Sequence, residues 1–301
     1  MDFNLARLRY LYEVALCGSM RAASEKVNVS PSSVSRQIAI LEQELGVAVL
    51  ERGRSKAKLT EAGEMVVEYY REDLARKETL ASHLDEIRGL RRGVVKIATG
   101  EGFVSDLLSE SISAFEAAYP GVKLEVVVAG TNQILSSVES DEAHVGMVFD
   151  SPSAPRIATQ QTYQLPLKAV MSPRNPLAKK ESLRFKDLDG EKYALPPKNF
   201  RIREVMEQAA AKENFVLTPT LTSNSLMILK NSAMAPDTVT ILPDLAVFKE
   251  LKAGLLVSMP VESKGLSGTT AGIVTRSGRL LPVSAKAFLT YLRRYFQNEL
   301  R

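Results

Sequence analysis

Cysteine, histidine and tryptophan are nearly absent: the 301 residues include one cysteine, two histidines and no tryptophan. The single cysteine, Cys17, cannot form an intramolecular disulfide or a two-cysteine redox switch within one chain. With His83 and His144 as the only histidines, the sequence cannot supply a Cys/His metal cluster. We therefore expect no disulfide scaffold, no metal site and no zinc enzyme.

Long hydrophobic runs are also missing. A run such as Val126–Ala129 is far shorter than the ~20 residues that span a bilayer. The first residues, Met-Asp-Phe-Asn, lack the basic, apolar and small-residue order of a signal peptide. The composition, with 45% hydrophobic and 25% charged residues, is ordinary for a globular protein, and the length fits about two domains. We expect a cytoplasmic protein without a membrane span.

The net charge of +4 is too small to indicate a polyanionic partner by itself, so its distribution matters more. The basic excess is concentrated within residues 47–60. There Arg52, Arg54, Lys56 and Lys58 are opposed only by Glu51. These residues read as two short strands around a Gly-Arg-Ser turn, which predicts a small hairpin with a basic tip.

The first 45 residues predict three short helices. Apolar residues from Leu5 to Ala15 recur at helical spacing, and Gly18 followed by Ser19 ends that helix and caps a second one at 20–27. The third helix, about 31–45, begins with a good N-cap residue, Ser30, and a proline at the first helical position. Two helices joined by a tight turn are typical of a helix-turn-helix.

The third helix has one apolar and one polar face. The apolar stripe follows a 4-3-4 spacing: Val34, Ile38, Leu41 and Leu45. The opposite face is small and polar, with one arginine: Ser32, Arg36, Ala39 and Gln43, flanked by Ser35. Small polar side chains allow a helix to approach base edges in the major groove. For an isolated helix, a solvated surface charge is the favoured interpretation of Arg36; within a helix-turn-helix, contact with phosphate or guanine is favoured instead.

A long helix is predicted after Thr60, with an apolar seam between residues 66 and 90. Thirty helical residues extend about 45 Å, which is too long for one small domain to bury. Pairing with a partner helix explains this length better than packing on the helix's own domain.

Beyond Gly93 the pattern changes to alternating strands and helices, which predicts a parallel sheet with covering helices. The first strands are expected at 94–98, 123–128 and 144–149. A second α/β unit occupies about 163–264, with strands near 192–195, 217–222 and 238–242. A strand near 270–275 and a helix near 283–299 could return to the first unit. No internal repeat is evident.

These N-terminal residues closely resemble the LysR-type transcriptional regulators over about 60 residues. The matching segments are Ala22-Ala23, Val27-x-Val29-Ser30, Val34-Ser35-Arg36-Gln37-Ile38, Leu41-Glu42-x-x-Leu45-Gly46, Leu50-Glu51-Arg52 and Leu59-Thr60-x-Ala62-Gly63. The resemblance implies a winged helix-turn-helix at 1–60 and a linker and dimerisation helix at 61–92. It also implies an effector-binding domain at 93–301, similar to periplasmic binding proteins. That domain would have two Rossmann-like lobes, about 93–162 with 265–301, and about 163–264.

The resemblance also implies the residues that contact DNA. Ser32, Ser33, Ser35 and Arg36 match the recognition helix, and Arg52 and Arg54 match the wing. The family commonly has glutamine where Pro31 stands, and proline cannot make that side chain's base contact. This departure leaves the operator sequence open.

Ligands of two-lobed α/β units bind beyond the C-terminal ends of strands, where helix N-termini face a cleft. By the resemblance, these loops line an effector cleft. The candidate effector-binding residues are Gly102, Phe103, Thr131, Asn132, Phe149, Phe200, Arg201 and Ser225. Arg201 or Arg203 could pair with a ligand carboxylate, or each could form a surface salt bridge. The family often has a small residue where Glu101 stands, so the charge of the ligand stays open.

The sequence therefore predicts a bacterial DNA-binding regulator controlled by a small-molecule effector. Its expected partners are double-stranded DNA, the effector, further copies in a dimer or tetramer, and RNA polymerase. A solute-binding protein without DNA function is the alternative, and an enzyme is the third reading. Gly100-x-Gly102 lacks the third glycine of a dinucleotide fingerprint, and no nucleophile–base pair or phosphate loop emerges. We expect no catalytic residues and no cofactor.

Overall fold

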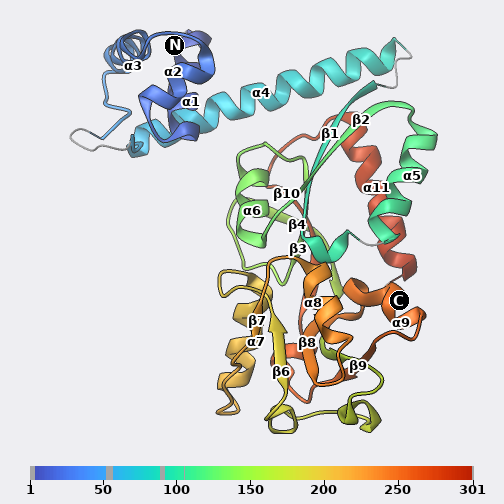
Figure 1. Ribbon diagram of the computed structural model, residues 1–301. Helices are drawn as coiled ribbons and strands as arrows, with labels where there is room; N and C mark the ends of the chain where they lie inside the picture. Colours follow the sequence, from blue (N-terminus) through green and yellow to red (C-terminus); the bar gives the residue numbers. More distant parts are fainter. Residues whose placement is uncertain (1–3, 52–56, 89–91, 105, 300–301) are drawn as a thin grey trace. The chain divides into compact units, whose positions relative to one another are not determined.

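A computed structural model describes residues 4–51, 57–88, 92–104 and 106–299 (Figure 1). These residues form two compact units, and the division between the units falls between Ala81 and Ser82.

The first unit contains three short helices at the predicted positions. They are α1 (Leu5–Cys17), α2 (Met20–Val27) and α3 (Pro31–Leu45). Ser19 and Ser30 cap α2 and α3 through their side chains, and Gly18 ends α1 in the left-handed conformation. The predicted stripe of α3 is buried among residues of α1 and α2. These predictions are confirmed. Each rests on a local signal, either a cap residue or the 3.6-residue helical period, which does not depend on distant parts of the chain.

The segment after α3 differs from the predicted hairpin of two strands. The described residues form a single antiparallel bridge between Leu50 and Leu59, with the amide of Glu51 donating to the carbonyl of Lys58 at 2.8 Å. Arg52 and Arg54 lie outside the described residues. The described flanks of the predicted hairpin thus pair in the antiparallel sense, but through one bridge and not through two strands, and the tip of the hairpin lies outside the described residues.

The long helix α4 (Glu61–Ile87) begins where predicted. The hydroxyl of Thr60 accepts a hydrogen bond from the amide of Gly63 at 3.1 Å, which caps the first turn. Tyr70 packs in the core of the first unit, whereas Leu80 and Leu84 are exposed. The apolar seam is thus only partly used within the chain.

The second unit contains two five-stranded sheets with the same pattern of pairing. The first has the order β2-β1-β3-β10-β4 and the second β7-β6-β8-β5-β9. The strands of the first sheet are β1 (Arg92–Thr99), β2 (Gly121–Val128), β3 (Val145–Phe149), β4 (Ile157–Gln164) and β10 (Thr270–Arg276). Those of the second are β5 (Leu167–Met171), β6 (Lys192–Leu195), β7 (Leu221–Thr222), β8 (Thr238–Pro243) and β9 (Val257–Pro260).

Both sheets are mixed, so the prediction of a parallel sheet holds for only part of each. In the first sheet β2, β1 and β3 are parallel, and β10 runs antiparallel to its neighbours β3 and β4. In the second sheet β7, β6 and β8 are parallel, and β5 runs antiparallel to β8 and β9. The chain crosses between the sheets along β4–β5 and again from β9 to β10.

Helices cover both faces of each sheet (Figure 1). On the first sheet, α5 (Asp106–Ala118) and α11 (Val283–Glu299) cover one face and α6 (Thr131–Glu139) the other. On the second, α7 (Arg201–Ala211) and α10 (Lys264–Ser267) lie opposite α8 (Leu226–Ala233) and α9 (Phe248–Lys252). Short 3₁₀ helices are η1 (Glu101–Phe103), η2 (Pro176–Lys179), η3 (Phe185–Leu188) and η4 (Asp244–Val247).

Candidate DNA-binding surface and ligand cleft

The outer face of α3 is exposed as the sequence predicted. Ser32, Ser33, Ser35 and Arg36 are all solvent-exposed. On the opposite side Val34, Ile38 and Leu41 are buried and Leu45 is partly buried. Arg36 forms no ion pair with any other residue that the structure describes. Its guanidinium is therefore available to a phosphate or a base edge, the two groups that an exposed arginine on such a helix binds.

The hydroxyl of Ser30 organises the beginning of α3. It accepts a hydrogen bond from the amide of Ser33 at 3.2 Å and lies 2.9 Å and 2.8 Å from the hydroxyls of Ser32 and Ser33. The N-terminal end of α3 thus presents a compact cluster of hydroxyl groups, each of which retains a free donor or acceptor position. Such a cluster can contact phosphate oxygens without steric conflict.

Two side chains that the sequence analysis did not single out fix the position of α3. Arg7 on α1 donates from its Nε to Gln37 at 3.2 Å and forms an ion pair with Glu44. Glu42 accepts hydrogen bonds from the amides of Val49 and Leu50, at 2.8 Å and 3.3 Å. These contacts join α3 to the helix before it and to the segment after it. Only Glu42 carried a signal, as part of the Leu41-Glu42 match.

A cleft that is partly open to solvent lies between the two sheets of the second unit. Six of the eight predicted residues line it: Gly102, Phe103, Thr131, Phe149, Phe200 and Arg201. Asn132 and Ser225 do not. Asn132 is exposed on α6, one position beyond the lining residue Thr131, and Ser225 is the N-cap of α8. A helix turns by about 100° per residue, so neighbours along it face different directions.

Most of the apolar residues that line the cleft were not predicted from the sequence. Pro196 and Pro243 lie at the ends of β6 and β8 and could have been found by the same rule that pointed to the other loops. Leu165 lies where the chain crosses between the sheets, and no local pattern marks it. The remaining apolar residues of the lining are Ala129, Ile202, Leu226, Leu229, Leu242 and Ala246.

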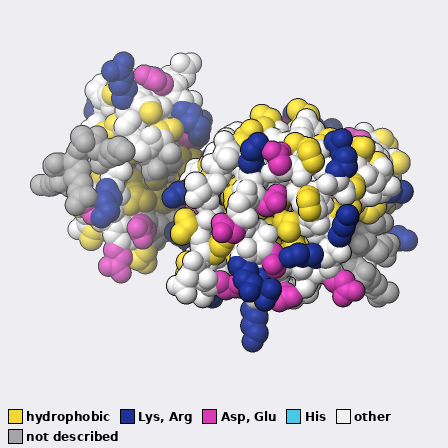
Figure 2. Space-filling model, turned by 60° about the horizontal axis from the view of Figure 1, so that its bottom comes forward, with side chains coloured by type: hydrophobic (Ala, Val, Ile, Leu, Met, Phe, Trp, Pro, Cys, Tyr) yellow, Lys and Arg dark blue, Asp and Glu magenta, His cyan; other side chains and the backbone are white. Residues whose placement is uncertain are grey.

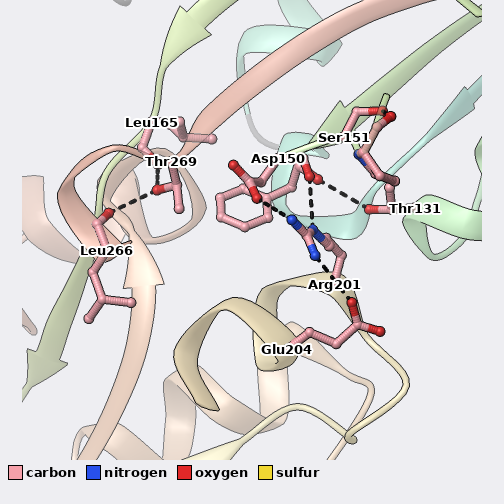
Figure 3. Close-up of polar contacts among 10 residues, drawn as sticks. Thr131, Asp150, Ser151, Leu165, Arg201, Glu204, Leu266 and Thr269 are labelled. Carbon is pink, nitrogen blue, oxygen red and sulfur yellow. Dashed lines mark hydrogen bonds and ion pairs between the residues drawn. The ribbon is translucent and has the colours of Figure 1, made fainter. Parts of the chain in front are cut away.

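Arg201 is occupied by carboxylates of the chain itself (Figure 3). Its Nη2 lies 2.8 Å from Oδ2 of Asp150, its Nε donates to the carbonyl of Asp150 at 2.9 Å, and its Nη1 lies 3.4 Å from Glu204. Asp150 follows β3 and Arg201 begins α7, so this ion pair connects the two sheets. The sequence left open whether Arg201 pairs with a ligand carboxylate or forms a salt bridge within the chain. In the structure it forms the salt bridge.

Arg203 is not part of the cleft lining. Its side chain is almost fully buried, at 1% exposure, and donates to the carbonyls of Pro196 at 3.4 Å and Leu217 at 3.2 Å. It also pairs with Glu207 at 2.9 Å. The reading of Arg203 as a partner for a ligand carboxylate is therefore wrong, because its donors are used to hold the loops around α7.

Glu101 makes a second connection across the cleft. Its Oε2 accepts a hydrogen bond at 3.0 Å from the amide of Leu226, the first residue of α8. The N-terminal amides of a helix lack partners within the helix and attract negative charge. The carboxylate of Glu101 fills this role from the opposite side of the cleft.

The crossing strands are tied together where they pass between the sheets (Figure 3). The hydroxyl of Thr269 donates to the carbonyl of Leu165 at 2.7 Å, and the amide of Leu165 donates to the carbonyl of Thr269 at 2.9 Å. The same hydroxyl lies 2.9 Å from the carbonyl of Leu266. Two adjacent, hydrogen-bonded crossings form a natural hinge between lobes.

Charge on the rest of the second unit is mixed. Figure 2 shows basic and acidic side chains intermixed with hydrophobic ones over the face of the larger unit turned to the viewer. Within the described residues, no helix has the length and apolar character needed to cross a membrane.

Two family models together cover most of the chain. One described as "LysR substrate binding domain" matches residues 88–297, and one described as "Bacterial regulatory helix-turn-helix protein, lysR family" matches residues 5–64.

Individual proteins are similar over the full length. The transcriptional dual regulator GltC of Bacillus subtilis is 28% identical over 98% of both chains. A probable RuBisCO transcriptional regulator of Trichormus variabilis is 24% identical over 96% of this chain and 87% of its own.

Solved structures show the same fold. A full-length OxyR variant from Pseudomonas aeruginosa has a TM-score of 0.69 at 20% identity and covers 97% of this chain and 95% of its own. Full-length CbnR in complex with its target DNA has a TM-score of 0.54 at 20% identity, over 97% of this chain and 100% of its own.

Proposed function

Because the chain belongs to the LysR family of DNA-binding transcriptional regulators, as its N-terminal motifs predicted, we propose how its parts divide this function. Residues 1–60 bind DNA, residues 61–92 link and dimerise, and residues 93–301 bind the effector. One observation carries the proposal: α3 combines an apolar stripe that is buried at Val34, Ile38 and Leu41 with an exposed polar face that includes Ser32, Ser35 and Arg36. A helix of this kind can enter the major groove while it stays anchored to its own domain.

The residues proposed to contact DNA have different roles. Ser32, Ser33 and Ser35 approach the backbone and base edges through their hydroxyls, and Arg36 binds guanine or phosphate. Arg52 and Arg54, in the proposed wing, neutralise phosphates beside the recognition helix. Pro31 at the first helical position offers no side-chain donor to a base.

The cleft between the lobes is the proposed effector site. Gly102, Phe103, Thr131, Phe149 and Phe200 supply its walls. An effector with a higher affinity for one arrangement of the lobes shifts the population toward it. The change would be coupled to DNA binding and bending through the assembly, with activation or repression as the output.

The exposed apolar residues of α4, among them Met65, Leu80, Leu84 and Ile87, support a dimer formed through this helix, and two dimers would form a tetramer. Since its proposed target is promoter DNA, we place the protein in the cytoplasm, with RNA polymerase as a further partner. We assign it no catalytic activity.

A mobility-shift assay with the DNA upstream of the protein's own gene tests the DNA-binding proposal. Loss of a base or phosphate contact by Arg36→Ala should cost about 1–3 kcal/mol, a roughly 5- to 150-fold weaker complex. Arg174→Ala is the matched control, because it removes an exposed arginine from the second unit. Equal affinities of both variants and the wild type would refute the assignment of the recognition helix.

A further inference from the structure

The cleft contains two charged side chains among its lining residues, and they are not equivalent. Arg201 is matched by two carboxylates, Asp150 and Glu204, whereas Glu101 faces one backbone amide. Carboxylates therefore outnumber guanidinium groups at the cleft. The nearby Lys198 does not change this balance, since its side chain is 81% exposed and pairs with Glu207 at 4.0 Å.

One of the helix N-termini at this cleft, that of α8, is already paired with a carboxylate. Glu101 reaches across the cleft and accepts a hydrogen bond from the amide of Leu226, the first residue of α8. An anionic ligand at the N-terminus of α8 would have to displace this carboxylate or lie beside it, and like charges at short range repel. Among the described residues of the lining, the one arginine, Arg201, is held by Asp150 and cannot compensate without breaking the connection between the lobes.

The remaining surface favours an apolar ligand. Phe103, Phe149 and Phe200 come from η1, β3 and the start of α7, so aromatic side chains approach the cleft from both lobes. Leu226 and Leu229 of α8 add aliphatic surface. The faces of aromatic rings also attract cations, which adds to the effect of Glu101.

We propose that the effector of this protein is a small apolar molecule that carries a positively charged amine, and that Glu101 recognises its charge. This inference rests on the proposed effector site in the cleft. A carboxylate has about four acceptor positions, so Glu101 can bind an ammonium group while it keeps its hydrogen bond to Leu226. The ligand thereby joins an existing contact between the lobes and favours their closed arrangement.

Calorimetric titration of the full-length protein with three matched probes tests the proposal: phenethylammonium, phenethyl alcohol and phenylacetate. We expect the ammonium compound to bind about tenfold more tightly than the alcohol, since a charge-assisted hydrogen bond is added. Phenylacetate should bind more weakly than the alcohol. No binding of the ammonium compound, or tighter binding of phenylacetate, would overturn the proposal.

Glu101→Gln removes the negative charge of this side chain and keeps an oxygen that can accept the Leu226 amide. The amide oxygen of glutamine can still accept the Leu226 amide, so the variant should keep its affinity for the alcohol and lose the preference for ammonium. Glu213→Gln, an exposed glutamate outside the cleft lining, is the control and should retain all three affinities. An ammonium preference that survives in Glu101→Gln would show that another group recognises the charge.

The proposed function and this inference fail in different ways. Operator binding by the wild type, lost in Arg36→Ala, supports the DNA-binding proposal whatever the cleft binds. Saturable binding of phenylacetate alone would leave the cleft as the effector site and refute the ligand class. Ammonium binding without an effect on operator affinity would support the ligand class and refute the regulatory coupling.

Discussion

Gly63 lies in the first turn of α4, where ordinary helix propensity and tertiary packing predict opposite effects of a substitution. By propensity alone, Gly63→Ala would stabilise the helix by about 1 kcal/mol. A methyl group at this position would instead lie 2.1 Å from the carbonyl oxygen of Val49 and 3.1 Å from Cδ2 of Leu59. Contact with a backbone oxygen requires a separation of roughly 3 Å or more, so the backbone at Val49 must move by about 1 Å.

That movement carries a cost beyond the steric contact. The carbonyl of Val49 accepts a hydrogen bond from the amide of Thr60 at 3.1 Å, which joins the end of the bridged segment to the start of α4. Overpacking costs about 1–3 kcal/mol, and a weakened hydrogen bond about 1 kcal/mol more. After the gain in helix propensity is subtracted, we expect a net loss of about 2 kcal/mol.

Hydrogen exchange of the full-length protein, followed in peptides that cover residues 31–64, measures this loss locally. A loss of about 2 kcal/mol makes exchange roughly 30-fold faster where opening is at equilibrium. Ala62→Gly is the matched variant in the same turn, and it should cost up to about 1 kcal/mol through propensity alone. If exchange in Gly63→Ala were as slow as in the wild type or slower, propensity would dominate and the packing argument would be wrong.

Two further substitutions test the second unit. Phe115 is fully buried among aromatic residues of α5 and α11, so Phe115→Ala should destabilise this unit by about 3–5 kcal/mol in denaturant unfolding; a loss below about 1 kcal/mol would contradict this core. For Asp187, a hydrogen bond from the amide of Arg184, followed by one from Lys180, lowers the pKa of the carboxyl to about 2. Because the pKa of Asp187 in the folded state is below its unfolded value near 4, the ionised carboxylate stabilises the fold at pH values above about 4. This stabilisation is lost as the pH falls through about 2. Asp187→Asn should therefore lower the midpoint of unfolding at pH 6 and have little effect at pH 2, and an NMR titration of the carboxyl near pH 4 would contradict the assignment.

The N-terminal helices could be predicted from the sequence because their signals are local. Ser30 and Pro31 define the start of α3, Gly46 defines its end, and the 4-3-4 stripe decides which face is buried. Gly63 shows where this reasoning stops. The match to Leu59-Thr60-x-Ala62-Gly63 marks the position, but only the close approach of Val49 explains why glycine stands there.

The antiparallel strands were predicted only in part: β10 was expected near 270–275, whereas β4, β5 and β9 were not. The β4 sequence, IATQQTYQ, has few apolar residues, because this strand lies at an edge of its sheet and only Tyr163 is buried. The β9 strand is short and half-buried, also at an edge. The central strands β3 and β8, by contrast, are almost fully buried, and their apolar runs were recognised. Edge strands such as β4 and β9 give a weak hydrophobic signal. This reason does not apply to β5, an interior strand that is apolar and mostly buried and was also missed.

The cleft illustrates a further limit, since its charge is decided by pairs that lie far apart in the sequence. The rule that ligands bind after strands located Thr131, Phe149 and Arg201, because it depends only on the order of strands and helices. It could not determine whether Arg201 is free, since the partner Asp150 precedes it by 51 residues. Nor could it show that Glu101 reaches the amide of Leu226, 125 residues away.

Both pairs connect the lobes, so the same contacts that set the charge of the cleft also resist its opening. A ligand that adds to these contacts favours closure, and one that competes for them favours opening. An effector with an ammonium group, as proposed above, would add to the contact made by Glu101 and shift the lobes toward closure.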